Sequence, residues 1–342
     1  TASSPLSLLP IPTIQTKDAS FRNFSRTSFR DIKSLKALKT KYLVVYILGR
    51  LFGTAGIRGS IREKVTPELA FKLGLALGEV LEHRGDAIIG WDTRTSSLML
   101  YHALSAGLIA GGINPKPLGL TPYPAIARGT VREKASVGVV ITASHNPPTD
   151  NGIKCFNSNG LEYLSEQEEQ LETWILDKKP RTASEKGREE NPEYSLDDYI
   201  EEVVETVGRC VKPIKVLVDC ANGASYNVTP RILREIGCKV VSINSNPDGH
   251  FPGRKPEPSP ENLEETMRIA RALNVDICFA HDGDADRIAV INEKGEFIPT
   301  YKVTALLASL KLEREKGKVI ISVDMGRAVR ELVAVSYTHL TL

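Results

Sequence analysis

The feature that most constrains the fold is a regular alternation of apolar strand patterns with helix patterns, which begins at Thr66. Pro67 follows Thr66, as is typical of the first turn of a helix. Apolar residues then recur at helical spacing, at Leu69, Leu73, Ala76, Leu77, Val80 and Leu81. Residues 87–91 predict a strand, and a second apolar helix starts at Ser96. Strands that alternate with helices form a mostly parallel sheet covered by helices, so the sequence predicts an α/β fold.

A polar loop follows one of the expected strands. Residues 137–141 are mostly β-branched and predict a buried strand, and residues 142–147 (Thr-Ala-Ser-His-Asn-Pro) come directly after it. Ser144 therefore lies just beyond the end of a strand, where α/β sheets place their ligands. The loop presents a hydroxyl at Ser144, an imidazole at His145 and, shortly afterwards, the amine of Lys154. An ordinary polar turn is the alternative interpretation.

A second polar loop carries three carboxylates at alternate positions. Residues 276–280 predict a strand, and Asp282, Asp284 and Asp286 follow it. Carboxylates this close together repel one another unless a cation neutralises them, and hard oxygen ligands favour Mg²⁺ or Ca²⁺. An EF-hand would have glycine at the sixth position of the loop, where this chain has Arg287, and we reject that motif. A solvated acidic turn is the alternative.

Four motifs together resemble those of the α-D-phosphohexomutases, the phosphomannomutase/phosphoglucomutase family, and they stand in the family's order. They are residues 52–59 (Phe-Gly-Thr-Ala-Gly-Ile-Arg-Gly), the loop 142–147 with 151–154 (Asn-Gly-Ile-Lys), residues 219–224 (Asp-Cys-Ala-Asn-Gly-Ala) and the acidic loop 282–287. The second and fourth motifs are highly specific and the other two are supportive. The resemblance covers roughly residues 48–330 and implies successive α/β domains with mixed, mostly parallel sheets.

The resemblance implies that Ser144 carries a phosphate and passes it to a hexose phosphate. The resulting sugar 1,6-bisphosphate reorients and returns its other phosphate to the serine, which interconverts hexose 1-phosphate and hexose 6-phosphate. Asp282, Asp284 and Asp286, together with the Ser144 phosphate, would hold one Mg²⁺ ion. Phosphoryl transfer depends mainly on positioning and charge neutralisation, and these residue types suit it.

Four more side chains complete the expected site: Arg58, Arg287, Lys154 and His145. Arg58 and Arg287 would contact phosphate oxygens with the planar fork that lysine lacks. Lys154 is the candidate general base, because a metal and arginines nearby would lower the pKa of an amine. Without the family, surface ion pairs and a surface lysine are the alternatives.

His145 is expected to organise the loop or to contact phosphate. A Ser-His hydrolase is disfavoured because adjacent residues on an extended segment point to opposite sides and no Gly-x-Ser-x-Gly turn surrounds Ser144. Asp92 and Arg94 are expected to form a structural ion pair that supports the Ser144 loop. A Pro/Gly loop that begins at Asn246 is longer than a connector requires, which hints at function.

Changes in composition predict the domain limits. Residues 1–47 are rich in Ser, Thr, Lys and Arg and predict a disordered, targeting or non-native leader. The remaining segments are expected to be domain I with the serine loop (48–178), a charged linker (179–194), domain II with the acidic loop (195–296) and the truncated start of a third domain (297–342). The final residues, 336–342, fit neither the α/β pattern nor the family and are expected to be non-native.

Composition bears on partners and compartment. A net charge of +2 over 342 residues makes no case for binding nucleic acid or a membrane. No apolar run approaches the roughly 18–20 residues that span a bilayer. The scattered cysteines predict reduced thiols in a cytoplasmic protein, or an organellar (plastid-type) one if the leader is a native transit peptide. A monomer or a homodimer is expected.

Three functions are compatible with these residues. The first is a phosphohexomutase with little or no turnover, because complete members have four domains and the substrate-contacting loops of the third and fourth are not found here. The second is a Mg²⁺-dependent sugar-phosphate phosphatase, and the third is a non-catalytic protein that binds sugar phosphates. The loops that would discriminate among mannose, glucose and glucosamine phosphates are not found.

Overall fold

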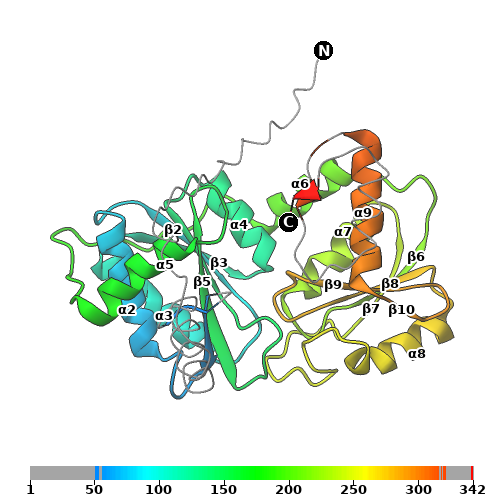
Figure 1. The fold of residues 1–342 in the computed structure, drawn as a ribbon, viewed down its shortest axis with the longest axis horizontal. Helices are drawn as coiled ribbons and strands as arrows, with labels where there is room; N and C mark the ends of the chain where they lie inside the picture. The colour runs from blue at the N-terminus through cyan, green and yellow to red at the C-terminus, as the bar shows by residue number, and fades with distance from the viewer. Residues whose placement is uncertain (1–50, 54–55, 316, 318, 321–339, 342) are drawn as a thin grey trace, which may run out of the picture. The chain divides into compact units, whose positions relative to one another are not determined.

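The protein is described from a computed structural model that covers residues 51–53, 56–315, 317, 319–320 and 340–341. The predicted leader, residues 1–47, lies outside these residues, as do residues 54–55 of the first motif and most of the predicted non-native end. The two large sheets belong to one compact unit, Leu48–Leu342 (Figure 1). The predicted domain limits stay predictions.

The first sheet has five strands in the spatial order β1-β5-β4-β2-β3. β4 pairs in parallel with β2, and β2 with β3, whereas β5 runs antiparallel to both β4 and β1. Four of its five strands therefore share one direction, which confirms the predicted mixed, mostly parallel arrangement. The strands are β1 (Ile57–Ser60), β2 (Asp86–Trp91), β3 (Asn114–Leu120), β4 (Val137–Ile141) and β5 (Asp150–Asn157).

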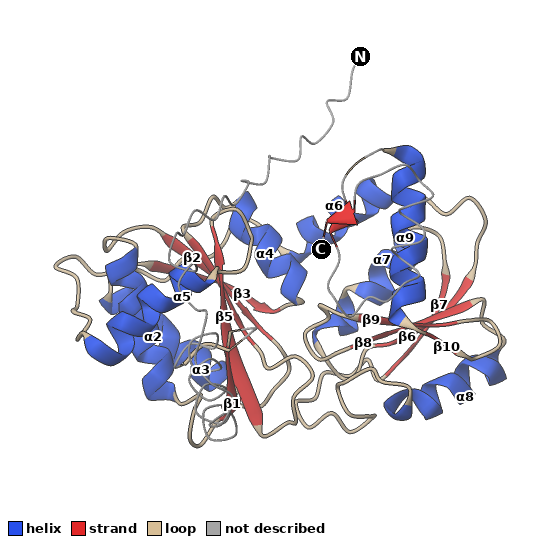
Figure 2. Cartoon of the chain, in the orientation of Figure 1, coloured by secondary structure: helices blue, strands red, loops and turns tan. Residues whose placement is uncertain are grey.

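Helices cover both faces of this sheet (Figure 2). Successive strand residues point to opposite faces, so Ile89 packs in the core beneath α2, α3 and α5, whereas Ile88 packs in the core beneath α4. The covering helices are α2 (Pro67–Val80), α3 (Ser97–Ala110), α4 (Tyr123–Arg132) and α5 (Ser165–Glu172), which continues as the π-helix η2 (Thr173–Asp177). The Thr66 hydroxyl accepts a hydrogen bond from the Leu69 amide and caps α2, as the sequence predicts.

The second sheet repeats the plan of the first, with the order β10-β9-β8-β6-β7. β7, β6 and β8 are parallel neighbours, and β9 is antiparallel to β8 and to β10. The strands are β6 (Lys215–Asp219), β7 (Lys239–Ile243), β8 (Ile277–His281), β9 (Ile288–Ile291) and β10 (Phe297–Ile298). The serine loop between β4 and β5 and the acidic loop between β8 and β9 thus occupy equivalent places in the two sheets.

The second sheet is also covered on both faces (Figure 2). α6 (Leu196–Val207) and α7 (Thr229–Glu235) pack on one face, and α8 (Glu264–Leu273) packs on the other. The 3₁₀ helices η3 (Ala224–Asn227) and η4 (Glu261–Leu263) precede α7 and α8. α9 (Thr300–Arg314), orange in Figure 1, follows β10 and has no buried residue. The short strands β11 (Val319–Ile320) and β12 (Leu340–Thr341) pair in parallel.

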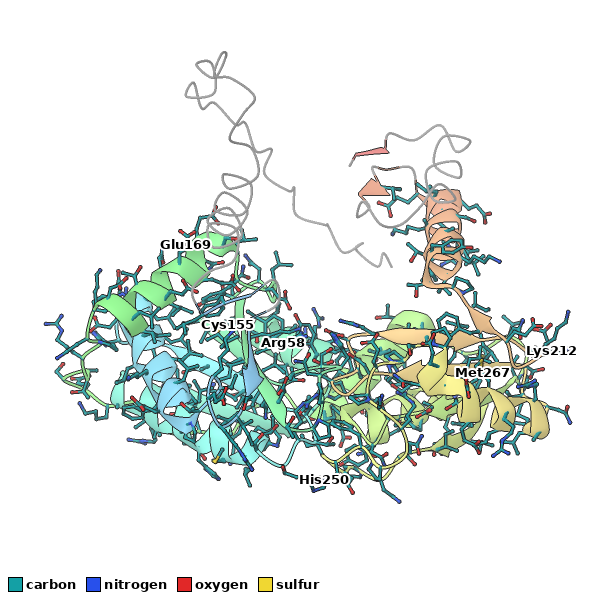
Figure 3. The ribbon with its side chains drawn as sticks, turned by 60° about the horizontal axis from the view of Figure 1, so that its bottom comes forward. Arg58, Cys155, Glu169, Lys212, His250 and Met267 are labelled. Atoms are coloured by element: carbon teal, nitrogen blue, oxygen red, sulfur yellow. The ribbon has the colours of Figure 1, made fainter. Side chains whose placement is uncertain are left out.

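The cysteines agree with the expectation of packed thiols. All five are free, and Cys155 on β5 lies buried in the first core (Figure 3). Burial raises the pKa values of Cys220 and Cys278 to about 12, so both remain thiols at neutral pH. Among the helices of the described part of the chain, none is long and apolar enough to cross a membrane.

Candidate active site

The serine loop and the acidic loop meet at the ends of their strands. The Ser144 hydroxyl donates a 2.6 Å hydrogen bond to Oδ2 of Asp282, which lies 138 residues further along the chain. Oγ1 of Thr142 lies 3.1 Å from Oδ2 of Asp284, and the backbone amide of Tyr123 donates to the carbonyl oxygen of Asp284 at 2.9 Å. The structure therefore brings the candidate nucleophile and the candidate metal ligands into direct contact.

The buried side chain of Arg94 holds the backbone of the serine loop in place. Arg94 is 2% exposed, and its Nε donates to Oδ2 of Asp92 at 3.0 Å, so the expected ion pair is present. The rest of its guanidinium donates to the backbone carbonyl oxygens of Ser144, Asn146, Pro147 and Asp150. A planar group with five donors can satisfy so many carbonyls at once, and this holds the loop in a single shape.

The backbone at Ser144 is left-handed, with φ at 51°. Side chains disfavour this region, which occurs where the surrounding structure imposes it. One consequence is that Oγ of Ser144 lies 3.3 Å from Nδ1 of His145. The expectation that these two side chains point to opposite sides is therefore wrong, because that argument holds only for an extended backbone.

The three aspartates of the acidic loop form a compact cluster. Asp282, Asp284 and Asp286 each bring an oxygen within 4.8 Å of the other two. Burial, followed by the charges of neighbouring carboxylates, raises the pKa of Asp282 well above its usual value and that of Asp284 to about 6. Oδ1 of Asp284 is buried without a hydrogen-bond partner. Mutual repulsion and an unsatisfied buried oxygen fit a site for a hard divalent cation.

Lys154 projects from β5 toward the same cluster. Its side chain is 4% exposed, and Nζ lies 3.4 Å from Oδ2 of Asp286 and 3.4 Å from Oε1 of Glu162. The ring of Tyr123 lies beneath the ammonium group, 4.3 Å from Nζ to the ring centroid, and the Tyr123 hydroxyl donates to Glu162. The predicted amine is thus close to the acidic loop and positioned by two residues that the sequence analysis missed.

Arg58 and Arg287 come from different halves of the compact unit, and the charges of both act on His145. Arg58 is on β1, where it pairs with Gly152 of β5, and its Nε is buried without a hydrogen-bond partner (Figure 3). Arg287 is half exposed at the end of the acidic loop. Partial burial, followed by the charges of Arg287 and Arg58, lowers the pKa of His145, and Glu257 acts in the opposite direction.

A carboxylate connects two of these cationic side chains. The Glu257 oxygens lie 3.1 and 3.3 Å from Nη1 of Arg287, and Oε2 lies 3.6 Å from Nε2 of His145. Glu257 belongs to the Pro/Gly loop that the sequence marked as unusually long, but its own role was not predicted. The eight predicted site residues thus fall in one region, which has an acidic centre at the aspartates and a basic edge at Arg58, His145 and Arg287.

Comparison with known proteins agrees with this geometry. Residues 49–182 match the family description "Phosphoglucomutase/phosphomannomutase, alpha/beta/alpha domain I", and residues 197–295 match domain II of the same family. The chain belongs to this family, as the four motifs indicated.

Two curated relatives and one solved structure show the extent of the similarity. The chain is 49% identical over 288 residues to a phosphopentomutase of Thermococcus kodakarensis, covering 83% of this chain and 63% of that protein. It is 43% identical to a probable phosphoglucosamine mutase of Methanopyrus kandleri, covering 84% of this chain and 64% of that protein. A putative phosphomannomutase from Thermus thermophilus superposes with a TM-score of 0.76 at 25% identity, over 85% of this chain and 68% of that one. The chain thus spans less than two thirds of the length of either curated relative.

Proposed function

We propose that this chain carries the phosphoserine and metal-binding part of a sugar-phosphate mutase site. The observation that carries the proposal is the 2.6 Å contact between Ser144 and Asp282, because it places a hydroxyl against a cluster of three carboxylates, two of them buried. Once this hydroxyl is phosphorylated, a cation held by the aspartates would neutralise part of the negative charge of the phosphate. The whole protein would interconvert hexose 1-phosphate and hexose 6-phosphate.

Each site residue has a role in this proposal. Asp282, Asp284 and Asp286, with the Ser144 phosphate, would hold Mg²⁺, which would neutralise charge on the phosphoryl group during transfer. The fit rests on the buried, unpartnered Oδ1 of Asp284 and on the raised pKa values of Asp282 and Asp284. Hard oxygen ligands without nitrogen or sulfur favour Mg²⁺ over softer metals.

The transfer itself exchanges one P–O bond for another. A sugar hydroxyl oxygen attacks the phosphorus on Ser144, and the bond from phosphorus to the serine oxygen breaks. The sugar hydroxyl proton passes to a base, and the leaving serine oxygen takes up a proton to give back the free hydroxyl. Lys154 is the proposed acid–base group, since its Nζ lies 3.4 Å from Oδ2 of Asp286, and it would accept the proton as the neutral amine. Arg58, Arg287 and His145 would bind phosphate oxygens at the basic edge.

The proposal does not specify which sugar phosphate is the preferred substrate. The relatives named above include a phosphopentomutase and a probable phosphoglucosamine mutase, so a pentose or an amino sugar competes with an unmodified hexose as the preferred substrate. The phosphoryl donors to compare are therefore glucose 1,6-bisphosphate, glucosamine 1,6-bisphosphate and ribose 1,5-bisphosphate.

The test is phosphorylation of Ser144. The protein is incubated with Mg²⁺ and each bisphosphate in turn, and intact mass and a phosphopeptide map are recorded. We expect one phosphate, on Ser144, with the preferred donor, and none in Ser144→Ala or after chelation of Mg²⁺. Ser158→Ala, at an exposed serine in the turn after β5, should be phosphorylated like the parent chain.

Two results would contradict the proposal. If the protein is folded but gains no phosphate from any donor, the assignment of Ser144 as the nucleophile is wrong. Steady release of inorganic phosphate that persists in Ser144→Ala would instead favour a Mg²⁺-dependent phosphatase.

A further inference from the structure

The Pro/Gly loop between β7 and η4 is anchored on the core of the second half. Asn222 donates from Nδ2 to the carbonyl oxygen of Asn246, and its Oδ1 accepts from the amide of Gly253. Nε of Arg254 donates to the buried carboxylate of Asp219 at 2.8 Å. These bonds hold the loop backbone at both ends of its first nine residues.

The same loop contacts the element that shapes the serine loop. Phe251 is 5% exposed, and the Arg94 guanidinium lies 5.1 Å from the centroid of its ring. A Cβ added at Gly249 would lie 2.4 Å from the carbonyl oxygen of Thr93, so the two backbones are in close contact there. The loop therefore has a set position relative to the serine loop, and the residues that follow Arg254 approach the site from a defined direction.

Glu257 is the loop residue that reaches the basic edge. Its backbone carbonyl accepts a 2.9 Å hydrogen bond from Asn262, whereas its side chain is 38% exposed and bridges Arg287 and His145. The backbone is thus held while the carboxylate can turn away at small cost, because exposed ion pairs are weak. A carboxylate between two cationic groups has the charge and the acceptor oxygens that a phosphate would offer them.

We propose that Glu257 is a specificity-determining carboxylate that occupies the phosphate position between Arg287 and His145 and must be displaced by the phosphate of the substrate. The inference rests on the proposed function, because it takes Arg287 and His145 to be phosphate-binding groups. Competition by Glu257 lowers the affinity for every anion. A phosphomonoester dianion, with three acceptor oxygens, overcomes this competition more readily than a singly charged anion does.

An opposite role for Glu257 makes an opposite prediction. If the carboxylate instead oriented Arg287 for phosphate, its removal would weaken anion binding. The sign of the change in affinity therefore decides between competition and orientation.

The experiment measures binding of inorganic phosphate by calorimetry to the unmodified 342-residue chain and to its Glu257→Gln variant. We expect the variant to bind roughly fivefold more tightly, the size of an exposed ion pair. Glu257→Asp should also bind phosphate more tightly, because the shorter aspartate side chain keeps the charge but does not extend to Arg287 and His145. In an Arg287→Ala background the Glu257→Gln change should increase the phosphate affinity by a smaller factor, since only His145 then remains as a partner of the carboxylate.

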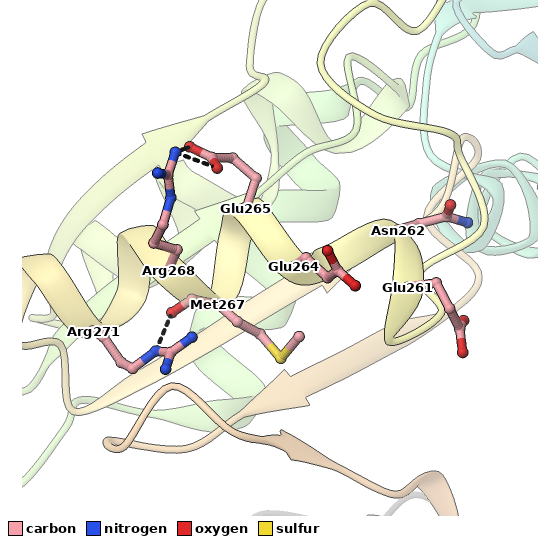
Figure 4. A pocket seen from close by; sticks show the side chains of 7 residues that line it. All are labelled: Glu261, Asn262, Glu264, Glu265, Met267, Arg268 and Arg271. Carbon is pink, nitrogen blue, oxygen red and sulfur yellow. Dashed lines mark hydrogen bonds and ion pairs between the residues drawn. The ribbon is translucent and has the colours of Figure 1, made fainter.

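Glu264→Gln is the matched control. Glu264 is exposed at the start of α8 and lines a polar hollow that includes none of the predicted site residues (Figure 4). The Glu264→Gln substitution removes the same negative charge at a position close to Glu257 in the sequence. A general effect of net charge on phosphate binding would therefore appear in this variant too. We expect its phosphate affinity to equal that of the parent chain.

The outcomes separate this inference from the proposed function. Unchanged or weaker phosphate binding in folded Glu257→Gln overturns the inference, as does a lack of phosphate binding in every variant. Phosphorylation of Ser144 is measured on the same samples. If Ser144 is phosphorylated while Glu257→Gln binds phosphate no more tightly, the inference alone fails. If Ser144 is never phosphorylated, the proposed function fails whatever the affinities are.

Discussion

At the scale of single residues, the guanidinium of Arg94 and the carboxylate of Asp92 determine the shape of the serine loop. Both groups are buried, and Asp92 also lies 2.8 Å from the hydroxyl of Thr142, whose oxygen accepts from the Ser144 amide. A buried ion pair contributes little net stability against an apolar alternative, but the loss of one partner is expensive. The main contribution of this ion pair is therefore to the loop, because Arg94 donates hydrogen bonds to the loop carbonyl oxygens.

Replacing Arg94 tests this. Arg94→Lys keeps the charge but offers a single nitrogen, which cannot reach Asp92 and four carbonyl oxygens together. We expect a loss of about 2–4 kcal/mol in the free energy of unfolding, measured in urea, and loss of Ser144 phosphorylation. Arg128→Lys, at a half-exposed pair with Glu202, should change stability by less than about 1 kcal/mol. Equal effects of the two substitutions would show that the Arg94 network is not specific.

The pKa values of the acidic loop predict how the effect of Mg²⁺ depends on pH. Burial is the main cause that raises the pKa of Asp284 to about 6 in the metal-free fold, above its unfolded value of about 3.9. The native state therefore binds more protons than the unfolded state between these values. Its stability falls as pH rises from about 4 to 6, by up to about 3 kcal/mol from this group. The proposed binding of Mg²⁺ to the ionised carboxylates should restore that stability above pH 6.

The measurement is the thermal midpoint with and without Mg²⁺ at several pH values. The stabilisation by Mg²⁺ should be small near pH 5 and grow through about pH 6, where the Asp284 carboxyl ionises. Asp284→Asn should flatten the pH dependence and reduce the effect of the ion. A stabilisation by Mg²⁺ that is the same at pH 5 and above pH 7 would count against binding at this cluster.

At the scale of elements, glycines set the spacing of α2 and α3. A Cβ added at Gly107 would lie 2.1 Å from the carbonyl oxygen of Phe71, and one added at Gly74 would lie 2.6 Å from that of Leu104. Real Cβ atoms do not come this close to a carbonyl oxygen, so the two helices contact each other through their backbones. Larger residues would force the helices apart and loosen the core above β2 and β4.

Gly107→Ala should therefore destabilise the fold. Alanine favours a helix by about 1 kcal/mol over glycine, but overpacking in a close contact costs about 1–3 kcal/mol or more. We expect a net loss of about 1–2 kcal/mol in the free energy of unfolding in urea. Ala106→Ser, at the exposed neighbouring position, should change it by less than about 0.5 kcal/mol. A stabilised Gly107→Ala would mean that the helices separate without loss.

At the scale of the whole molecule, the two sheets share one plan and bring equivalent loops together. In both, the functional loop lies between a parallel strand and the antiparallel strand beside it. α9 lies outside this arrangement: Leu306, Leu307 and Leu310 are 59%, 60% and 45% exposed. The helix contributes no buried residue, so the site should not depend on it.

Shortening the chain tests that independence. A chain that ends at Pro299 keeps β10, whose Phe297 packs against the buried Leu263 and Ala280. We expect its thermal midpoint to change by less than about 2 °C and its Ser144 phosphorylation to persist. A chain that ends at Arg287 loses the buried Ala289 and Ile291 of β9 and should not fold its second sheet. Loss of folding in the chain that ends at Pro299 would show that α9 or the residues after it are needed.

Local pattern was sufficient for the elements and for the chemical character of the loops. Runs such as residues 137–141 mark a strand because each β-branched residue favours an extended backbone wherever it stands. The polar residues that follow mark the ends of those strands, and their types indicated phosphate and metal. Family membership could be inferred for the same reason, since the motifs are contiguous in the chain.

The sequence by itself thus determined the α/β fold, the order of the strands along the chain and the residues that form the candidate site. Only the tertiary structure decided that Ser144 contacts Asp282, that His145 turns toward Ser144, and that Tyr123, Glu162 and Glu257 hold the cationic groups. Apart from the pair of Lys154 with Glu162, these contacts join segments tens of residues or more apart, or depend on one left-handed residue that the surrounding loop imposes. Neither leaves a periodic trace in sequence, because the free energy that selects them comes from the packing of the complete fold.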